Sequence, residues 1–353
     1  MKRNKWVGLV GLLVLIALSC GGWQTAWAKD VVRVAEGPFL SGAGVFIARD
    51  KGYFDKLGLD VKVQLYSDGV LALPAMISGE LDIAVQGAAA SFFNAVEKGA
   101  PLVIFLDRGN NRPGRALTAT VVSQPMYDQG LHTFSDIAKL KGKKIGVSGV
   151  GSINQYAISM ALVKAGLNPA TDVQWVINVP QPDLMKMLGQ NQLDAIGAAY
   201  NIATAAESNK FGHIIGTDDQ SVPGGQVAVH AVSKNFIAQH RDALVRFTMA
   251  YLQAVKEFND AALHPDAHPD VIDILAKNTS LGKPELVKAI APHWSYMSED
   301  GEPNIKSIMT MQDFWAGPYF HFVKKKLPEK QLFDLSIIKE ARERLARERP
   351  FGP

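Results

Sequence analysis

Short apolar runs alternate with longer segments of helical periodicity along the chain. In its first third, the pattern predicts strands at residues 31–35, 59–65, 81–85 and 101–106, and helices at residues 43–57, 70–78 and 88–98. Gly58 and Gly79 directly follow two of these helices, in the position where glycine commonly ends a helix. This part of the chain therefore predicts a unit of strands connected by helices.

The same order of elements returns later in the chain. The second set comprises strands at residues 144–147, 173–179 and 193–197 and helices at residues 153–165 and 182–188. The sequence "Gly-Leu, strand, helix, Leu-Asp, strand" occurs at residues 58–83 and again at residues 166–196. Strands that alternate with helices form parallel sheets with helical crossovers, so the repeat predicts two similar α/β lobes with mostly parallel sheets.

The two lobes are expected to share the chain unequally. Apolar strands at residues 117–123 and 226–232 flank the second unit and are interpreted as two crossings between the lobes, after which helices dominate. The expected division is residues 29–120 plus 228–353 for a discontinuous lobe 1, with a helical C-terminal extension, and residues 121–227 for lobe 2.

The first 28 residues have the pattern of a secretory signal peptide. A basic stretch at residues 2–5 precedes an apolar run at residues 6–18, which is shorter than the roughly 20 residues of a membrane span. Ala26-Trp27-Ala28 fits a small-x-small cleavage site, so we expect cleavage after Ala28 and a periplasmic product. Cys20 leaves an alternative open, in which the protein is a lipoprotein anchored through that cysteine.

Charge and cysteine content narrow the class of protein. The chain has 37 Lys and Arg residues against 34 Asp and Glu residues, and Lys2, Arg3 and Lys5 account for the excess. The remaining chain is neutral, which argues against a nucleic-acid partner. Cys20 is the single cysteine, so neither an internal disulfide nor a cysteine-based metal site is expected. We expect no metal and no cofactor.

Three segments resemble a known family. They are "ARDKGYFDKLGLDV" at residues 48–61, "SGELDI" at residues 78–83 and "LKGKKIGV" at residues 140–147, the last followed by Gly151-Ser152. In content, order and spacing they resemble the periplasmic substrate-binding proteins of nitrate/sulfonate/taurine-type ABC transporters, which share a fold with thiamine-pyrimidine-binding proteins. The resemblance covers about residues 31–320.

The resemblance implies a fold and a function. The fold would be α/β, a type II-like two-lobed periplasmic binding protein. Its function would be to capture a small, anionic organic or oxyanion solute (sulfonate, taurine or nitrate-like). The solute would bind in the cleft between the two lobes, which would close over it by a hinge motion. Closure is favoured because both lobes contact the solute only in the closed form. The expected partners are this solute and an ABC permease with a cytoplasmic ATPase, and we expect a monomer.

Loops after strands are the candidate solute contacts, because ligands of open α/β sheets bind beyond the carboxyl ends of the strands. The loops are residues 37–42, 66–69, 86–88, 148–152, 180–182 and 199–201. Within and beside them, the candidates are Phe39, Leu40, Ser41, Gln86, Gly87, Ser148, Gly151, Ser152, Gln155, Tyr200 and Asn201. Ser152 opens a helix, where backbone N–H groups favour an anion; alternatively it only caps that helix.

Three arginines form a second candidate group. Arg108, Arg112 and Arg115 lie near the first crossing and could clamp a carboxylate or sulfonate in bidentate fashion. The alternative interpretation is a solvated loop.

Two other classes of protein share features with this sequence. Enzymes on the same fold, of the pyrimidine-synthase or desulfinase type, depend on cysteines that are absent after residue 20. An extracytoplasmic sensor domain would usually continue into a transmembrane helix. After the apolar run at residues 6–18, the sequence contains no further apolar run long enough to span a membrane. The sequence therefore favours a binding protein that is not an enzyme.

Overall fold

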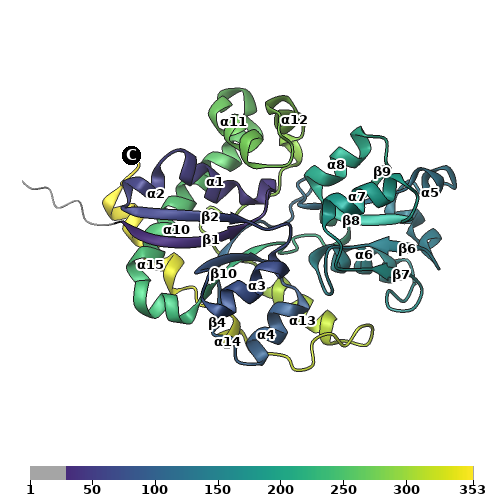
Figure 1. The fold of residues 1–353 in the computed structure, drawn as a ribbon, viewed down its shortest axis with the longest axis horizontal. Coiled ribbons are helices and arrows are strands. Elements are labelled where there is room, and N and C mark those ends of the chain that lie inside the picture. The colour runs from purple at the N-terminus through teal and green to yellow at the C-terminus, as the bar shows by residue number, and fades with distance from the viewer. Residues whose placement is uncertain (1–28, 353) are drawn as a thin grey trace, which may run out of the picture.

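The computed structural model describes residues 29–352, and Figure 1 shows two sheets side by side, with most of the helices around the first. The expected signal peptide and Cys20 lie outside the described residues. The strands are β1 (Asp30–Glu36), β2 (Leu59–Leu65), β3 (Ile83–Gln86), β4 (Leu102–Asp107), β5 (Thr118–Val122), β6 (Lys144–Gly146), β7 (Gln174–Val176), β8 (Ala195–Ala199), β9 (His213–Thr217) and β10 (Val229–Ser233). The α-helices are α1 (Ala43–Asp50), α2 (Tyr53–Lys56), α3 (Gly69–Ser78), α4 (Ala90–Glu97), α5 (Gln124–Asp128), α6 (Ile153–Lys164), α7 (Gln181–Gly189), α8 (Tyr200–Ser208), α9 (Asp218–Ser221), α10 (Lys234–Leu263), α11 (Pro269–Asn278), α12 (Pro284–Ala289), α13 (Ile305–Ala316), α14 (Glu329–Leu332) and α15 (Ser336–Glu348).

The two sheets have the same topology. The strand order is β2-β1-β3-β10-β4 in the first sheet and β7-β6-β8-β5-β9 in the second. The predicted α/β fold with two similar lobes is confirmed. The sheets are mixed but mostly parallel, as expected: four strands of each sheet run in the same direction and one runs against them. β10 and β5 run antiparallel to both of their neighbours, because each arrives from the crossing between the lobes instead of through a helical crossover.

Both faces of each sheet are buried. In β4, Leu102 and Ile104 join one apolar cluster, while Val103 and Phe105 join another on the opposite face. Helices α3, α4 and α13 pack on the face with Leu102 and Ile104, whereas α1, α10 and α15 cover the face with Val103 and Phe105 (Figure 1). Within residues 29–352, no helix combines the length and apolar character of a membrane span.

Two element predictions needed correction. The helix expected at residues 43–57 is broken into α1 and α2, because Gly52 adopts a left-handed φ of 73° that a continuous helix does not allow. Residues 199–201, expected as a loop, instead contain the end of β8 and the first turn of α8. The strand passes directly into the helix there.

The two crossings between the sheets lie side by side. The backbone N–H of Arg108 donates to the carbonyl of Ala228 at 3.1 Å, and that of Asn111 donates to the carbonyl of Gly225 at 2.9 Å. The Gln226 carboxamide ties them further: its Nε2 donates to Asp107 Oδ1 at 2.6 Å and to two backbone carbonyls. The connection between the sheets is therefore a hydrogen-bonded pair of segments.

A buried carboxyl group lies next to this pair. Asp218, at the start of α9, accepts hydrogen bonds from the backbone N–H groups of Leu117 and Thr118 at 3.2 Å each. Burial raises the pKa of Asp218 to about 7, although hydrogen bonds from Thr118 and Asn111 oppose the shift. At pH values between about 4, the ordinary pKa of an aspartate, and the pKa of Asp218 in the folded protein, the folded state binds more protons than the unfolded state. The contribution of Asp218 to stability therefore falls as the pH rises through this range.

Asp218→Asn tests this assignment, since asparagine keeps an acceptor for both N–H groups. We expect the difference in unfolding free energy between the variant and the wild type to shift by about 2–3 kcal/mol in favour of the variant when the pH is raised from 5 to 8. Urea unfolding at both pH values measures it. The control is Asp183→Asn at an exposed site of α7, for which we expect no such gain. A difference for Asp218→Asn that does not change with pH would contradict the assignment.

Candidate ligand-binding site

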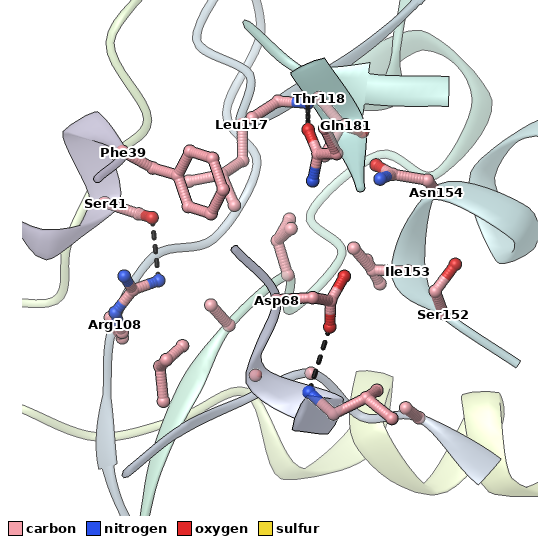
Figure 2. A pocket seen from close by; sticks show the side chains of 18 residues that line it. Phe39, Ser41, Asp68, Arg108, Leu117, Thr118, Ser152, Ile153, Asn154 and Gln181 are labelled. Carbon is pink, nitrogen blue, oxygen red and sulfur yellow. Dashed lines mark hydrogen bonds between the residues drawn. The ribbon is translucent and has the colours of Figure 1, made fainter. Parts of the chain in front are cut away.

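A cavity lies where the two sheets face each other. Its volume is about 70 Å³, which exceeds several times the roughly 10–15 Å³ needed for one water on the same measure. The wall contains residues that follow β1, β2, β3 and β4 in the first sheet, and residues that follow β6 and β7 or end β8 in the second. Figure 2 shows these side chains converging. The carboxyl ends of the strands in both sheets therefore build the site, as expected for open α/β sheets.

The N-terminus of α6 supplies hydrogen-bond donors to the cavity. Ser152 caps this helix, and its Oγ accepts from the backbone N–H of Gln155 at 3.3 Å. The next two residues, Ile153 and Asn154, line the cavity. Among the described residues, no acceptor pairs with their backbone N–H groups. A helix N-terminus with unpaired N–H groups favours an anionic or strongly polar acceptor.

Two carboxamides point into the cavity from the second lobe (Figure 2). The Oε1 of Gln181 accepts from the backbone N–H of Ala199 at 2.7 Å, which turns its Nε2 towards the cavity. Asn154 is only 3% exposed, and its Oδ1 has no partner within the described chain. Buried polar groups are normally hydrogen-bonded, so these two amides are candidate contacts for a polar ligand.

Arg108 contributes to the cavity wall from the first lobe, but its charge is already paired. Its Nε and Nη2 donate to Glu36 Oε2 at 2.9 and 2.5 Å, and its Nη1 donates to Ser41 Oγ at 2.7 Å. The other oxygen of Glu36 lies 2.6 Å from His230 Nε2. Arg108 therefore orients Ser41 at the cavity while Glu36 balances its charge.

Burial acts in opposite directions on the two partners of this network. Although burial alone would raise it, the pKa of Glu36 lies below its ordinary value, because the neighbouring Arg108 and His230 stabilise the carboxylate. Burial lowers the pKa of His230, and Glu36 opposes this only in part. A neutral His230 with its proton on Nε2 donates to Glu36 and leaves Nδ1 as an acceptor without a partner in the described chain.

Asp68 joins the two lobes at the edge of the cavity. Its Oδ1 caps α3 by accepting from the backbone N–H of Val70 at 2.9 Å, and its Oδ2 accepts from Ser148 Oγ of the second lobe at 2.5 Å. Away from the two crossings, further hydrogen bonds join the lobes, from Asn201 Nδ2 to Ser280 Oγ at 2.5 Å and from the Ala90 N–H to the Gly151 carbonyl at 3.3 Å. The structure is therefore a closed arrangement.

The candidate residues from the sequence divide into three groups. Phe39, Ser41, Gly87, Arg108 and Ser152 line the cavity. A second group supports the lining residues or the contact between the lobes. Gln86 Nε2 donates to the Gly69 carbonyl, and Gln155 Oε1 accepts from the Gly151 N–H. Hydrogen bonds between the lobes involve Ser148, Gly151 and Asn201. The third group lies away from the cavity: Leu40 packs in the core of the first lobe, and Tyr200 packs against His293.

The arginine cluster does not act as one unit. Arg112 stacks on the Tyr296 ring at 4.8 Å, and Arg115 lies near the same ring and donates from Nε to the Trp294 carbonyl at 2.8 Å. Of the three, only Arg108 contributes to the cavity wall. Neither the three-arginine clamp nor a fully solvated loop describes the arrangement.

Sequence reasoning did not select four polar residues of the cavity wall, Asp68, Thr118, Asn154 and Gln181. Thr118 begins β5, outside the selected loops. Asp68 and Gln181 lie in loops that were selected by position, 66–69 and 180–182, but nothing in the sequence showed which loop residue faces the cavity. Asn154 lies one position beyond Ile153, in the first turn of the helix that Ser152 opens. A rule that extends each candidate loop by the first turn of the following helix would have included it.

A cavity between two lobes of equal topology, with a wall built by both lobes, defines the class of two-lobed α/β proteins. The chain belongs to the NMT1/THI5-like family, whose model matches residues 41–267. A Brucella abortus protein named as a binding protein is 25% identical over 306 residues, which cover 78% of this chain and 86% of that protein. The nitrate import ATP-binding protein NrtC of Synechocystis is 23% identical over 330 residues, 89% of this chain and 46% of that protein.

Solved structures show the same fold. The periplasmic nitrate-binding protein NrtA from Synechocystis superimposes with a TM-score of 0.71 at 14% identity, covering 92% of each chain. The periplasmic aliphatic sulphonate-binding protein SsuA from Escherichia coli gives a TM-score of 0.64 at 19% identity, covering 86% of this chain and 91% of that one. The chain thus has the fold of these two periplasmic binding proteins, and the Brucella relative is likewise named as a binding protein.

Proposed function

We propose that the protein is the extracytoplasmic solute receptor of an ABC importer and takes a small organic solute with an anionic group into the cavity between the lobes. The observation that carries the proposal is the wall of that cavity. Both lobes build it, and in the second lobe Asn154 Oδ1 and Gln181 Nε2 have no hydrogen-bond partner among the described residues. Groups left unpaired in the closed form are satisfied when a solute is enclosed.

The moving bodies in this proposal are residues 29–120 with 228–353, and residues 121–227. The paired segments between the sheets would form the hinge, since a few residues at the ends of elements can absorb a closing motion. The Asp68–Ser148, Asn201–Ser280 and Ala90–Gly151 hydrogen bonds would form on closure and break on opening.

An anionic group of the solute would lie at the N-terminus of α6. The N–H groups of Ile153 and Asn154 and the Nε2 of Gln181 donate towards the cavity there, and the dipole of α6 adds to their attraction. Nitrate, sulfonates and taurine, which carries an anionic sulfonate group, are the solutes named for the resembling family.

The remaining parts of the proposal concern location and partners. We propose export by the N-terminal signal with cleavage after Ala28, anchoring through Cys20 being the alternative, and work in the periplasm as a monomer. The closed form would dock on a permease that a cytoplasmic ATPase drives. The homology to periplasmic binding proteins and to the import ATP-binding protein supports this arrangement.

A thermal-shift and calorimetric panel tests the function. The panel contains taurine, ethanesulfonate, nitrate, an aromatic carboxylate and a thiamine precursor. A true solute at about 100 times its Kd should add about 2.7 kcal/mol to the free energy of unfolding. We expect at least one compound to raise Tm by several degrees, and Asn154→Leu to weaken its binding at least tenfold. If no compound shifts Tm at millimolar concentration, the proposed function is wrong.

A further inference from the structure

The cavity wall contains a serine whose hydroxyl proton has no acceptor in the described chain. Ser41 lines the cavity and is 1% exposed. Its only hydrogen bond within residues 29–352 is the one that its Oγ accepts from Arg108 Nη1 at 2.7 Å (Figure 2). A guanidinium donates and cannot accept, so the Ser41 proton cannot be given to Arg108. The first lobe therefore has an unused donor at the cavity.

The guanidinium of Arg108 is fixed on its other side. Its Nε and Nη2 donate to Glu36 Oε2 at 2.9 and 2.5 Å, and the second oxygen of Glu36 lies 2.6 Å from His230 Nε2. Glu36, Arg108 and His230 are each at most 1% exposed. All three nitrogens of the guanidinium are thus engaged, two with a buried carboxylate and one with the Ser41 hydroxyl.

This arrangement determines how the Ser41 hydroxyl interacts with its surroundings. Hydrogen bonds in a chain polarise one another, so a cation that donates to Oγ makes the Ser41 proton a stronger donor. A buried donor without a partner costs free energy, which an acceptor in the cavity removes. Glu36 is not part of the cavity wall, but through Arg108 it holds the group that is.

We propose that Glu36 and Arg108 are positioning residues that act on the solute through Ser41, by holding its hydroxyl as a donor to an acceptor atom of the solute on the side of the first lobe. This inference rests on the proposed function. It adds a donor to those at the N-terminus of α6 in the second lobe, so both lobes donate hydrogen bonds to one enclosed molecule.

A double-mutant cycle tests the inference. The probe is the compound of taurine, ethanesulfonate, nitrate, the aromatic carboxylate and the thiamine precursor that binds the wild type most tightly, titrated into the full mature chain by calorimetry at pH 7. Ser41→Ala removes the donor, and we expect it to weaken binding at least fivefold while the unliganded Tm changes little.

Arg108→Lys keeps a positive charge beside Glu36 but has one nitrogen in place of the three that bond Glu36 and Ser41. We expect this variant also to bind at least fivefold more weakly. In the Ser41→Ala background the same substitution should change Kd by less than about twofold, because its route to the solute is gone. A merely structural role of Arg108 would give the same loss in both backgrounds.

Two further variants complete the design. Glu36→Asp keeps the carboxylate but draws it back by one methylene, so we expect the same dependence on Ser41; it also keeps the test usable if Arg108→Lys does not fold. Arg112→Lys is the matched control. Arg112 stacks on the Tyr296 ring and is not part of the cavity wall, so this variant should bind as the wild type does.

The possible outcomes separate this inference from the function. If Ser41→Ala binds the probe as tightly as the wild type, the inference is wrong and the receptor function stands. The same holds if Arg108→Lys or Glu36→Asp weakens binding equally with and without the Ser41 hydroxyl. If none of the five compounds binds the wild type, the proposed function and the inference both fail.

Discussion

Replacing Glu36 by glutamine will lower the free energy of unfolding by about 3–5 kcal/mol. The side chains of Glu36 and Arg108 are 0% and 2% exposed and lie 2.5 Å apart, so the substitution leaves a buried guanidinium without a counter-charge. His230 also loses the carboxylate with which its Nε2 interacts. Urea unfolding at pH 7 measures the change directly.

Two comparisons make the Glu36→Gln result interpretable. Glu80→Gln changes the same group at an exposed site, and we expect a change within about 0.5 kcal/mol. The double variant Glu36→Gln, Arg108→Met removes both charges and should recover part of the loss, which gives the coupling energy of the pair. A Glu36→Gln protein as stable as the wild type would contradict the buried ion pair.

Replacing Gly87 by leucine will abolish solute binding without harming the fold. Gly87 lines the cavity, its backbone has no left-handed φ, and a Cβ built there meets no atom nearer than 3.9 Å. A leucine side chain can therefore extend into the cavity, where the solute is proposed to bind. Because a non-glycine residue also restricts the unfolded chain, the unliganded protein should stay within about 1 kcal/mol of the wild type.

The readout for Gly87→Leu is calorimetry with the probe that gives the largest Tm shift in the wild type, combined with the unliganded Tm. Ala346→Leu places the same side chain on the exposed part of α15 and should bind as the wild type does. If the Gly87→Leu variant keeps its affinity for the probe, the solute binds in another part of the molecule and the site assignment is wrong.

Local pattern predicted most elements of this fold because the signals for them are local. The alternation at residues 59–65 gives the observed bounds of β2, and Gly79 ends α3 with a left-handed φ of 81°, as expected. The antiparallel direction of β5 and β10 was not predicted, because a strand's direction in a sheet depends on where the chain has come from.

The site was harder to predict because its chemistry arises from pairs distant in sequence. Arg108 was selected for its charge, but nothing near it in sequence shows that Glu36, 72 residues away, neutralises that charge. The role of Asp68 depends likewise on Ser148, 80 residues further on. The ligand contacts themselves stay a prediction for all the candidate residues.

The pairing of the two crossings has a consequence for exchange between proteins. Asn111 and Gly225 are hydrogen-bonded neighbours, so their Cα atoms lie within about 5.5 Å, a gap that a two-residue turn can bridge. The segment 112–224 therefore begins and ends at neighbouring positions in the fold, so it can be replaced as one unit. Grafting the corresponding segment of a related protein would replace the half of the cavity wall with Asn154 and Gln181 and keep the half with Asp68 and Arg108, so the two halves of the wall can be exchanged independently.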